Sequence, residues 1–153
     1  MAKLRHVAIQ VPDLEKAGRF YETVFDMERV CRGDTPFGNA LMLSDGVMNL
    51  TLLQFPEGTK GMINGPDWAG MHHVGFVVDD AEATAKKIEE EGGSYYYTLE
   101  GDYEGLQAEE KYKDINGVVF DISEHGWATE PVGRLRKEKE EREARARETV
   151  PAE

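Results

Sequence analysis

The sequence contains one pattern twice, and this constrains the fold more than any other feature. The stretch RHVAIQVPDLEKA begins at Arg5, and HHVGFVVDDAEAT begins at His72. Each copy has a His, an apolar run and an Asp that opens a segment with helical spacing. The offset of 67 residues aligns His6 with His73 and Asp13 with Asp80. A unit of about 60 residues is marginal alone, so two units in 153 residues are predicted to share one core.

Each copy has the pattern of a β-α-β-β-β unit. Strand alternation places His6 and Gln10 opposite Val7 and Val11, and an amphipathic helix capped by Asp13 covers the apolar face. The predicted apolar stripe of this helix contains Leu14, Ala17, Tyr21, Val24 and Phe25. Further strands are expected near ERVCR, NALMLS and VMNLTLLQF, and in the second copy at SYYYTLE, LQAEEKY and GVVFDISE. We therefore predict an α+β fold that contains two β-α-β-β-β modules.

The predicted domain boundaries follow from this repeat. Residues 1–133 form a single domain, with module one at 4–56, a linker rich in Gly and Pro at 57–70, and module two at 71–126. Residues 134–153 have charge pairs at helical spacing but almost no apolar residues, which predicts a charged C-terminal helical tail.

Composition excludes some partners. The formal net charge is −12, and no basic patch with interleaved aromatic residues appears, so nucleic acid is not an expected partner. The apolar runs are far shorter than the roughly 18 residues that span a bilayer, and no signal peptide is recognisable, so no membrane is expected. The single Cys31 cannot form an internal disulfide, which agrees with a cytoplasmic protein.

The segments LRHVAIQV, MHHVGFVV and DINGVVFDI resemble the vicinal oxygen chelate superfamily over roughly residues 4–125. This superfamily includes glyoxalase I, methylmalonyl-CoA epimerase, extradiol dioxygenases and bleomycin-resistance proteins. The resemblance implies that the two paired β-α-β-β-β modules form a cup-shaped mixed sheet, because members of the superfamily pair two such modules in this way. A divalent metal can be held in the cup by residues of the first and last strands of each module. The resemblance implies His6, His73 and Asp121 as metal ligands. It places Asn49, in GVMNLTLL, where the family commonly has Glu or Gln.

Strand alternation supports this site independently, because it also puts Asn49 and Asp121 on the cup face of their strands. The alternative is that these are polar residues on a solvated sheet face. Four such positions at repeat-related places favour metal binding. Two His and one carboxylate are compatible with Zn, Ni, Co, Mn or Fe.

The remaining candidates concern substrate and catalysis. In glyoxalase-type enzymes a metal-bound carboxylate is the general base, so the resemblance implies Asp121 as the catalytic residue. Asn49, Gln10 and His125 are candidates for substrate binding; Asn49 is equally compatible with weak ligation or a place near the metal, and His125 with a structural turn. His72 precedes His73, so alternation predicts that it points away from the cup.

We predict a metal-dependent lyase or isomerase of the glyoxalase/epimerase type that acts on a small molecule with adjacent oxygens. A divalent ion with one carboxylate and a neutral Asn49 leaves a formal +1, which favours an anionic, enediolate-like chelate. The first alternative is a non-haem Fe(II) dioxygenase of the extradiol type, and the second is a non-enzymatic, bleomycin-resistance-like sequestering protein. A homodimer is expected, and the modules pair either within one chain or across the dimer.

Removal of the tail after Gly133 tests the predicted boundary. Its residues bury too little apolar surface to offset an ordering cost of roughly 1–2 kcal/mol per residue, so metal content and thermal midpoint should stay nearly unchanged. A drop of many degrees in a thermal melt would show that the tail docks on the domain.

Overall fold

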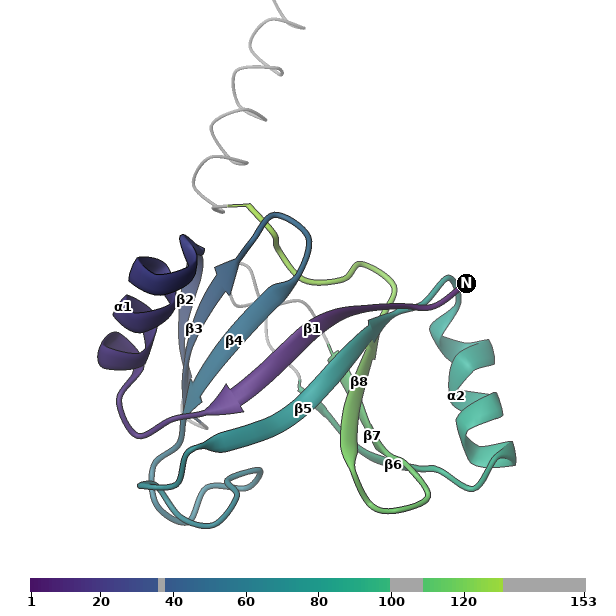
Figure 1. Cartoon of the computed structure of the whole chain (residues 1–153). Helices are drawn as coiled ribbons and strands as arrows, with labels where there is room; N and C mark the ends of the chain where they lie inside the picture. The colour runs from purple at the N-terminus through teal and green to yellow at the C-terminus, as the bar shows by residue number, and fades with distance from the viewer. Residues whose placement is uncertain (36–37, 100–108, 131–153) are drawn as a thin grey trace, which may run out of the picture.

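Each repeat folds as a β-α-β-β-β unit in the computed structural model, which describes residues 1–35, 38–99 and 109–130 (Figure 1). The first unit contains β1 (Lys3–Gln10), α1 (Leu14–Phe25), β2 (Glu28–Thr35), β3 (Gly38–Ser44) and β4 (Asn49–Gln54). The second contains β5 (Gly70–Val77), α2 (Ala81–Glu90), β6 (Ser94–Leu99), β7 (Glu109–Lys113) and β8 (Val119–Ser123). The predicted tail, 134–153, lies outside the described residues.

The strands of the described residues form one open, mixed sheet in the order β2-β3-β4-β1-β5-β8-β7-β6. Within each unit the first and last strands pair in parallel, and all other neighbours are antiparallel. Figure 1 shows α1 and α2 at opposite ends of this sheet. The predicted α+β class and the pairing of two β-α-β-β-β modules are confirmed.

The two units join within this chain through β1 and β5. The pairing is antiparallel and centred on Val7 opposite Val74, with His6 opposite Gly75 and Ala8 opposite His73. Because both repeats have the order His, Val, small residue, antiparallel pairing places each His opposite a small residue of the other copy. Neither imidazole meets a bulky cross-strand neighbour, and both fit between the units.

Two apolar clusters lie under the helices, on the sheet face opposite the predicted site. The first has Val11, Leu14, Leu41, Leu43 and Leu52 as its buried members. The second has Val78, Tyr112 and Ile122. Polar candidates on β1, β4 and β8 consequently face the other side of the sheet, as alternation predicts.

The apolar stripe predicted for the first helix is wrong for the C-terminal end of α1. Val24 and Phe25 were expected to pack on the sheet, but they are 53% and 60% exposed. The chain turns at Asp26, which has a φ of 53°, and Met27 packs against the first cluster instead. No helix within the described ranges is long and apolar enough to cross a bilayer.

The helix caps offer a matched test of the repeat. The Asp13 carboxylate accepts a hydrogen bond from the Lys16 backbone N–H at 2.9 Å, and that of Asp80 accepts one from Ala83 at 2.8 Å. We expect Asp13→Ala and Asp80→Ala each to lower the unfolding free energy by about 1 kcal/mol in urea denaturation. An unchanged midpoint in either variant would contradict the capping role of that Asp.

Candidate functional site

One row of paired residues crosses the centre of the sheet and carries most of the site. From β4 to β7, the Cα partners in this row are Asn49, His6, Gly75, Asp121 and Lys111. Partners in a row point to the same face of a sheet. Gly75 has no side chain, so the middle of the row is open, and the ring of His73 from two residues earlier on β5 reaches the same region.

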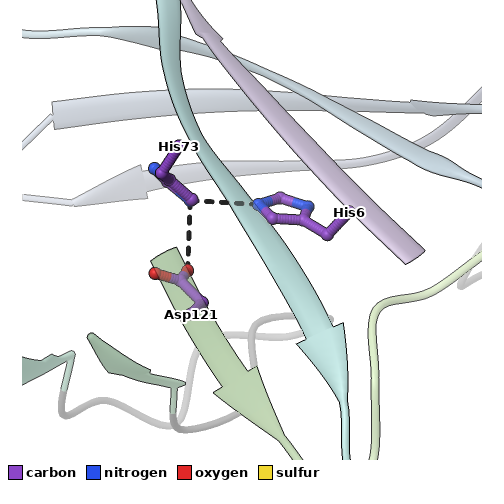
Figure 2. A group of neighbouring side chains, drawn as sticks. All are labelled: His6, His73 and Asp121. Atoms are coloured by element: carbon purple, nitrogen blue, oxygen red, sulfur yellow. Dashed lines mark hydrogen bonds and ion pairs between the residues drawn. The ribbon is translucent and has the colours of Figure 1, made fainter. Parts of the chain in front are cut away.

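His6, His73 and Asp121 converge there (Figure 2). The Nε2 atoms of the two imidazoles are 3.1 Å apart, and His73 Nε2 is 3.1 Å from Asp121 Oδ2. One ligand atom from each residue lies within 4.8 Å of the others. All three side chains are buried. The structure thus brings together the three residues that the sequence selects.

Hydrogen bonds behind His6 determine which of its nitrogens carries the proton. The Asn49 amide donates from Nδ2 to the Ala128 carbonyl at 2.8 Å, so its Oδ1 faces His6. That oxygen accepts from His6 Nδ1 at 3.0 Å and from the Thr51 hydroxyl at 2.8 Å. Neutral His6 therefore has its proton on Nδ1 and a lone pair on Nε2.

A second hydrogen-bonded chain fixes His73 in the same way. His72 donates from Nε2 to the Gly61 carbonyl at 2.7 Å, which leaves its Nδ1 as an acceptor. His73 Nδ1 lies 2.6 Å from this Nδ1 and is the donor. His73 Nε2 therefore also carries a lone pair directed into the site.

This role of His72 corrects the prediction that it points away from the cup. His72 is buried and contacts His73 because β5 has a bulge at this position: Ala8 pairs with His73 and Ile9 with Met71, leaving His72 as the extra residue. An extra residue breaks strict alternation locally.

Both imidazoles are held neutral. Burial lowers the pKa of His6 to about 4, and burial also holds the pKa of His73 well below its usual value. Lone pairs on two nitrogens and on Asp121 Oδ2 consequently point at one small region. His73 Nε2 lies 3.1 Å from each of the other two ligand atoms, a spacing that matches neighbouring ligands of an ion held at roughly 2.1 Å. In addition, Asp121 Oδ1 is buried without a hydrogen-bond partner among the described residues. The donor set fits a divalent metal.

Two charged residues of this site were missed by the sequence reasoning. Lys111 is buried, with its Nζ 2.5 Å from Asp121 Oδ2 and 3.4 Å from both His73 Nε2 and Glu109 Oε2. Glu109 is buried as well and accepts from the Trp127 indole N–H at 2.5 Å. Burial raises the pKa of the Glu109 carboxyl, whereas the nearby Asp121 and Glu109 carboxylates outweigh burial and raise the pKa of Lys111.

Strand parity identifies this pair once the buried face of β7 is known. Tyr112 on β7 is a buried member of the second apolar cluster. With Tyr112 facing the helix, Glu109 and Lys111 fall on the site face.

Trp127 covers His6. The two rings stack with centroids 4.5 Å apart and planes 8° apart. A Cβ atom at Gly75 would lie 2.5 Å from the Trp127 ring, so the glycine is required for this approach. The indole covers one face of the His6 ring.

The three residues predicted to contact substrate have different positions. Asn49 is fully buried behind His6, with both ends of its amide hydrogen bonded. Gln10 holds the segment before β5, donating to the Gly65 carbonyl and accepting from the Ile63 N–H, each at 2.8 Å. His125 is exposed and follows β8. None of the three presents a free polar group beside Asp121 in this structure.

The register also changes the equivalence expected between the modules. Asp121 pairs with Gly75, two residues after His73. Thr51 pairs with Ala8, two residues after His6, so Thr51 is the register counterpart of Asp121. Asn49, directly opposite His6, lies at the Nδ1 side of the ring and not in front of Nε2.

The sheet joins two repeated β-α-β-β-β modules, and each module contributes one His to the site. A family model, the Glyoxalase/Bleomycin resistance protein/Dioxygenase superfamily, matches residues 3–122. The chain belongs to this superfamily, which confirms the resemblance drawn from the sequence. No curated protein matches the sequence significantly.

Several solved structures share the fold. A hypothetical protein from Bacillus halodurans C-125 has a TM-score of 0.65 at 18% identity, covering 79% of this chain and 92% of that one. The methylmalonyl-CoA epimerase of Mycobacterium tuberculosis has a TM-score of 0.64 at 19% identity, covering 88% and 91%. A Streptomyces coelicolor methylmalonyl-CoA epimerase in complex with 2-nitronate-propionyl-CoA has a TM-score of 0.63 at 23% identity, covering 78% and 94%.

The tautomers can be tested by nitrogen-15 NMR of the metal-free protein. We expect His6 and His73 to carry the proton on Nδ1 and His72 on Nε2, with His6 becoming charged only as the pH approaches about 4. The unfolded chain protonates His6 near pH 6.5, so the contribution of neutral His6 to stability is fully present above pH 6.5 and is lost as the pH falls to about 4. A proton on Nε2 of His6 or His73 at pH 7 would contradict the converging lone pairs.

Proposed function

We propose that the protein is a metal-dependent isomerase of the epimerase type, which moves a proton at a carbon beside a carbonyl group. The supporting observation is the convergence of His6 Nε2, His73 Nε2 and Asp121 Oδ2, with both imidazole tautomers fixed from behind. These three residues would hold the metal. When bound, a divalent ion supplies Lewis acidity, which polarises a carbonyl oxygen and acidifies the neighbouring carbon.

Asp121 is the residue that transfers the proton in this proposal. Its Oδ2 faces the metal ligands, whereas Oδ1 has no partner among the described residues and is free to accept a proton. The backbone register across β5, β8 and β7 fixes the position of this carboxylate. A base held in place needs little reorganisation when the substrate arrives.

The charges of the site support an anionic substrate. The Lys111 ammonium and the Glu109 carboxylate add no net charge to the pocket, so a divalent ion and Asp121 would leave a formal +1. In a buried site this charge attracts an enolate or a carboxylate strongly. We infer a small molecule with adjacent oxygens, and the acyl thioesters named with the structural neighbours are the first compounds to test.

Fe(II)-dependent ring cleavage is the second candidate. Two His and one carboxylate with open coordination positions are the ligands that non-haem Fe(II) oxygenases use. The non-enzymatic sequestering function is third, because a cup that only binds does not need fixed imidazole lone pairs. A homodimer in the cytoplasm remains our proposal for its state in the cell. A dimer is not required to complete the site, since His6, His73 and Asp121 meet within one chain.

Deuterium exchange tests the proposed isomerase. The protein, loaded with Zn, Ni, Co, Mn or Fe, is incubated in D₂O with 2-oxo acids and malonyl-type thioesters, and loss of the proton beside the carbonyl is followed by NMR. We expect metal-dependent exchange that Asp121→Asn reduces at least 100-fold, as expected for removal of a general base.

Asp34→Asn is the matched control, because Asp34 is an exposed carboxylate on β2. The Asp34→Asn protein should catalyse proton exchange at the rate of the natural chain. Oxygen consumption with catechols and no exchange would favour the dioxygenase. Absence of bound metal and of metal-dependent stabilisation would contradict both enzymatic functions.

A further inference from the structure

The described residues place a cation of the chain itself beside the candidate metal ligands. Lys111 Nζ lies 2.5 Å from Asp121 Oδ2, the oxygen that faces His73, and 3.4 Å from His73 Nε2. The Lys111 side chain is only 5% exposed. An ammonium donates hydrogen bonds and accepts none. Lys111 therefore donates to two of the three converging ligand atoms, Asp121 Oδ2 and His73 Nε2.

We propose that Lys111 is an internal competitor for the metal site, and that metal binding transfers its ammonium from Asp121 to Glu109. This inference rests on the proposed function, because it takes the same three residues as the metal ligands. The predicted ligand set contains no lysine. Glu109, the ion-pair partner of Lys111, lies on the same strand and on the same face of the sheet.

The competition follows from the geometry. A divalent ion bound by Asp121 Oδ2 and His73 Nε2 would share both atoms with the ammonium. Two cations within a few ångströms of each other repel strongly in a buried site, where little water screens them. The ammonium must therefore leave Asp121 when the metal arrives.

Glu109 is the available destination. Its Oε2 is already 3.4 Å from Lys111 Nζ, and its Oε1 is held by the Trp127 indole at 2.5 Å. The flexible lysine stem allows a small movement of the ammonium while the strand stays fixed. Glu109 thus keeps the displaced charge paired inside the protein, where an unpaired ammonium would be costly.

Metal affinity of Lys111→Met tests the proposal. Lys113→Met is the matched control, since Lys113 lies two residues along β7 with its Nζ 4.0 Å from the Tyr96 ring centroid, away from the ligands. Dissociation constants for Mn and Zn are measured by competition with a chromogenic chelator. We expect Lys111→Met to bind at least about 10-fold more tightly than the natural chain, and Lys113→Met to be unchanged.

Thermal melts provide a second measurement on the same proteins. Without Lys111 the buried carboxylates lose their cation, so the metal-free variant should melt lower and gain more from added metal than the natural chain. Equal, finite dissociation constants for Lys111→Met and the natural chain would overturn the competition and leave the proposed function standing. Absence of metal binding in both would overturn both.

A crystal structure of the metal-loaded natural chain keeps the test decisive if Lys111→Met does not fold. We expect the Lys111 Nζ to hydrogen bond with Glu109 and to be out of contact with Asp121 Oδ2. An Nζ that still contacts Asp121 beside the metal, or that coordinates the metal itself, would overturn the transfer.

Discussion

The antiparallel pairing of β1 with β5 is the interaction on which the rest of the structure depends. It makes one sheet from two units that each have a separate apolar cluster under their helix, and its centre at Val7 and Val74 determines what lies opposite each histidine. A shift by one residue would turn every side chain of a strand to the other face. The position of the site therefore depends on strand register. It also depends on the small residues Gly75 and Ala8, which lie opposite His6 and His73.

The second requirement is electrostatic. Asn49 and His72 act from behind, since their hydrogen bonds leave both imidazoles with lone pairs directed at the same point as the Asp121 carboxylate. Lone pairs that face one another repel unless a cation lies among them, and burial makes this repulsion stronger. The buried Lys111 ammonium supplies positive charge to these atoms, and a metal ion at the candidate site would supply it in the same place.

The repeat and strand alternation predict the two modules, their pairing and the sheet face that carries His6, His73 and Asp121. Three parts of the site were out of reach for physical reasons. The bulge that turns His72 inward depends on how β1 and β5 pair, and Asn49 takes its place from a parallel register that no local pattern encodes. Glu109 and Lys111 resemble solvent-exposed strand residues until Tyr112 is known to be in the core.

The unequal pair formed by Thr51 and Asp121 has a stereochemical consequence. These residues occupy matching positions of the two units, yet only one is a carboxylate, so the approximate twofold relation between the histidines does not extend to the acid and base groups around them. A planar intermediate bound between the units would present one face to module one and the other to module two. Protons would be exchanged from the side of Asp121 alone, so epimerisation in this pocket would require the planar intermediate to turn its second face toward Asp121 before it is protonated again.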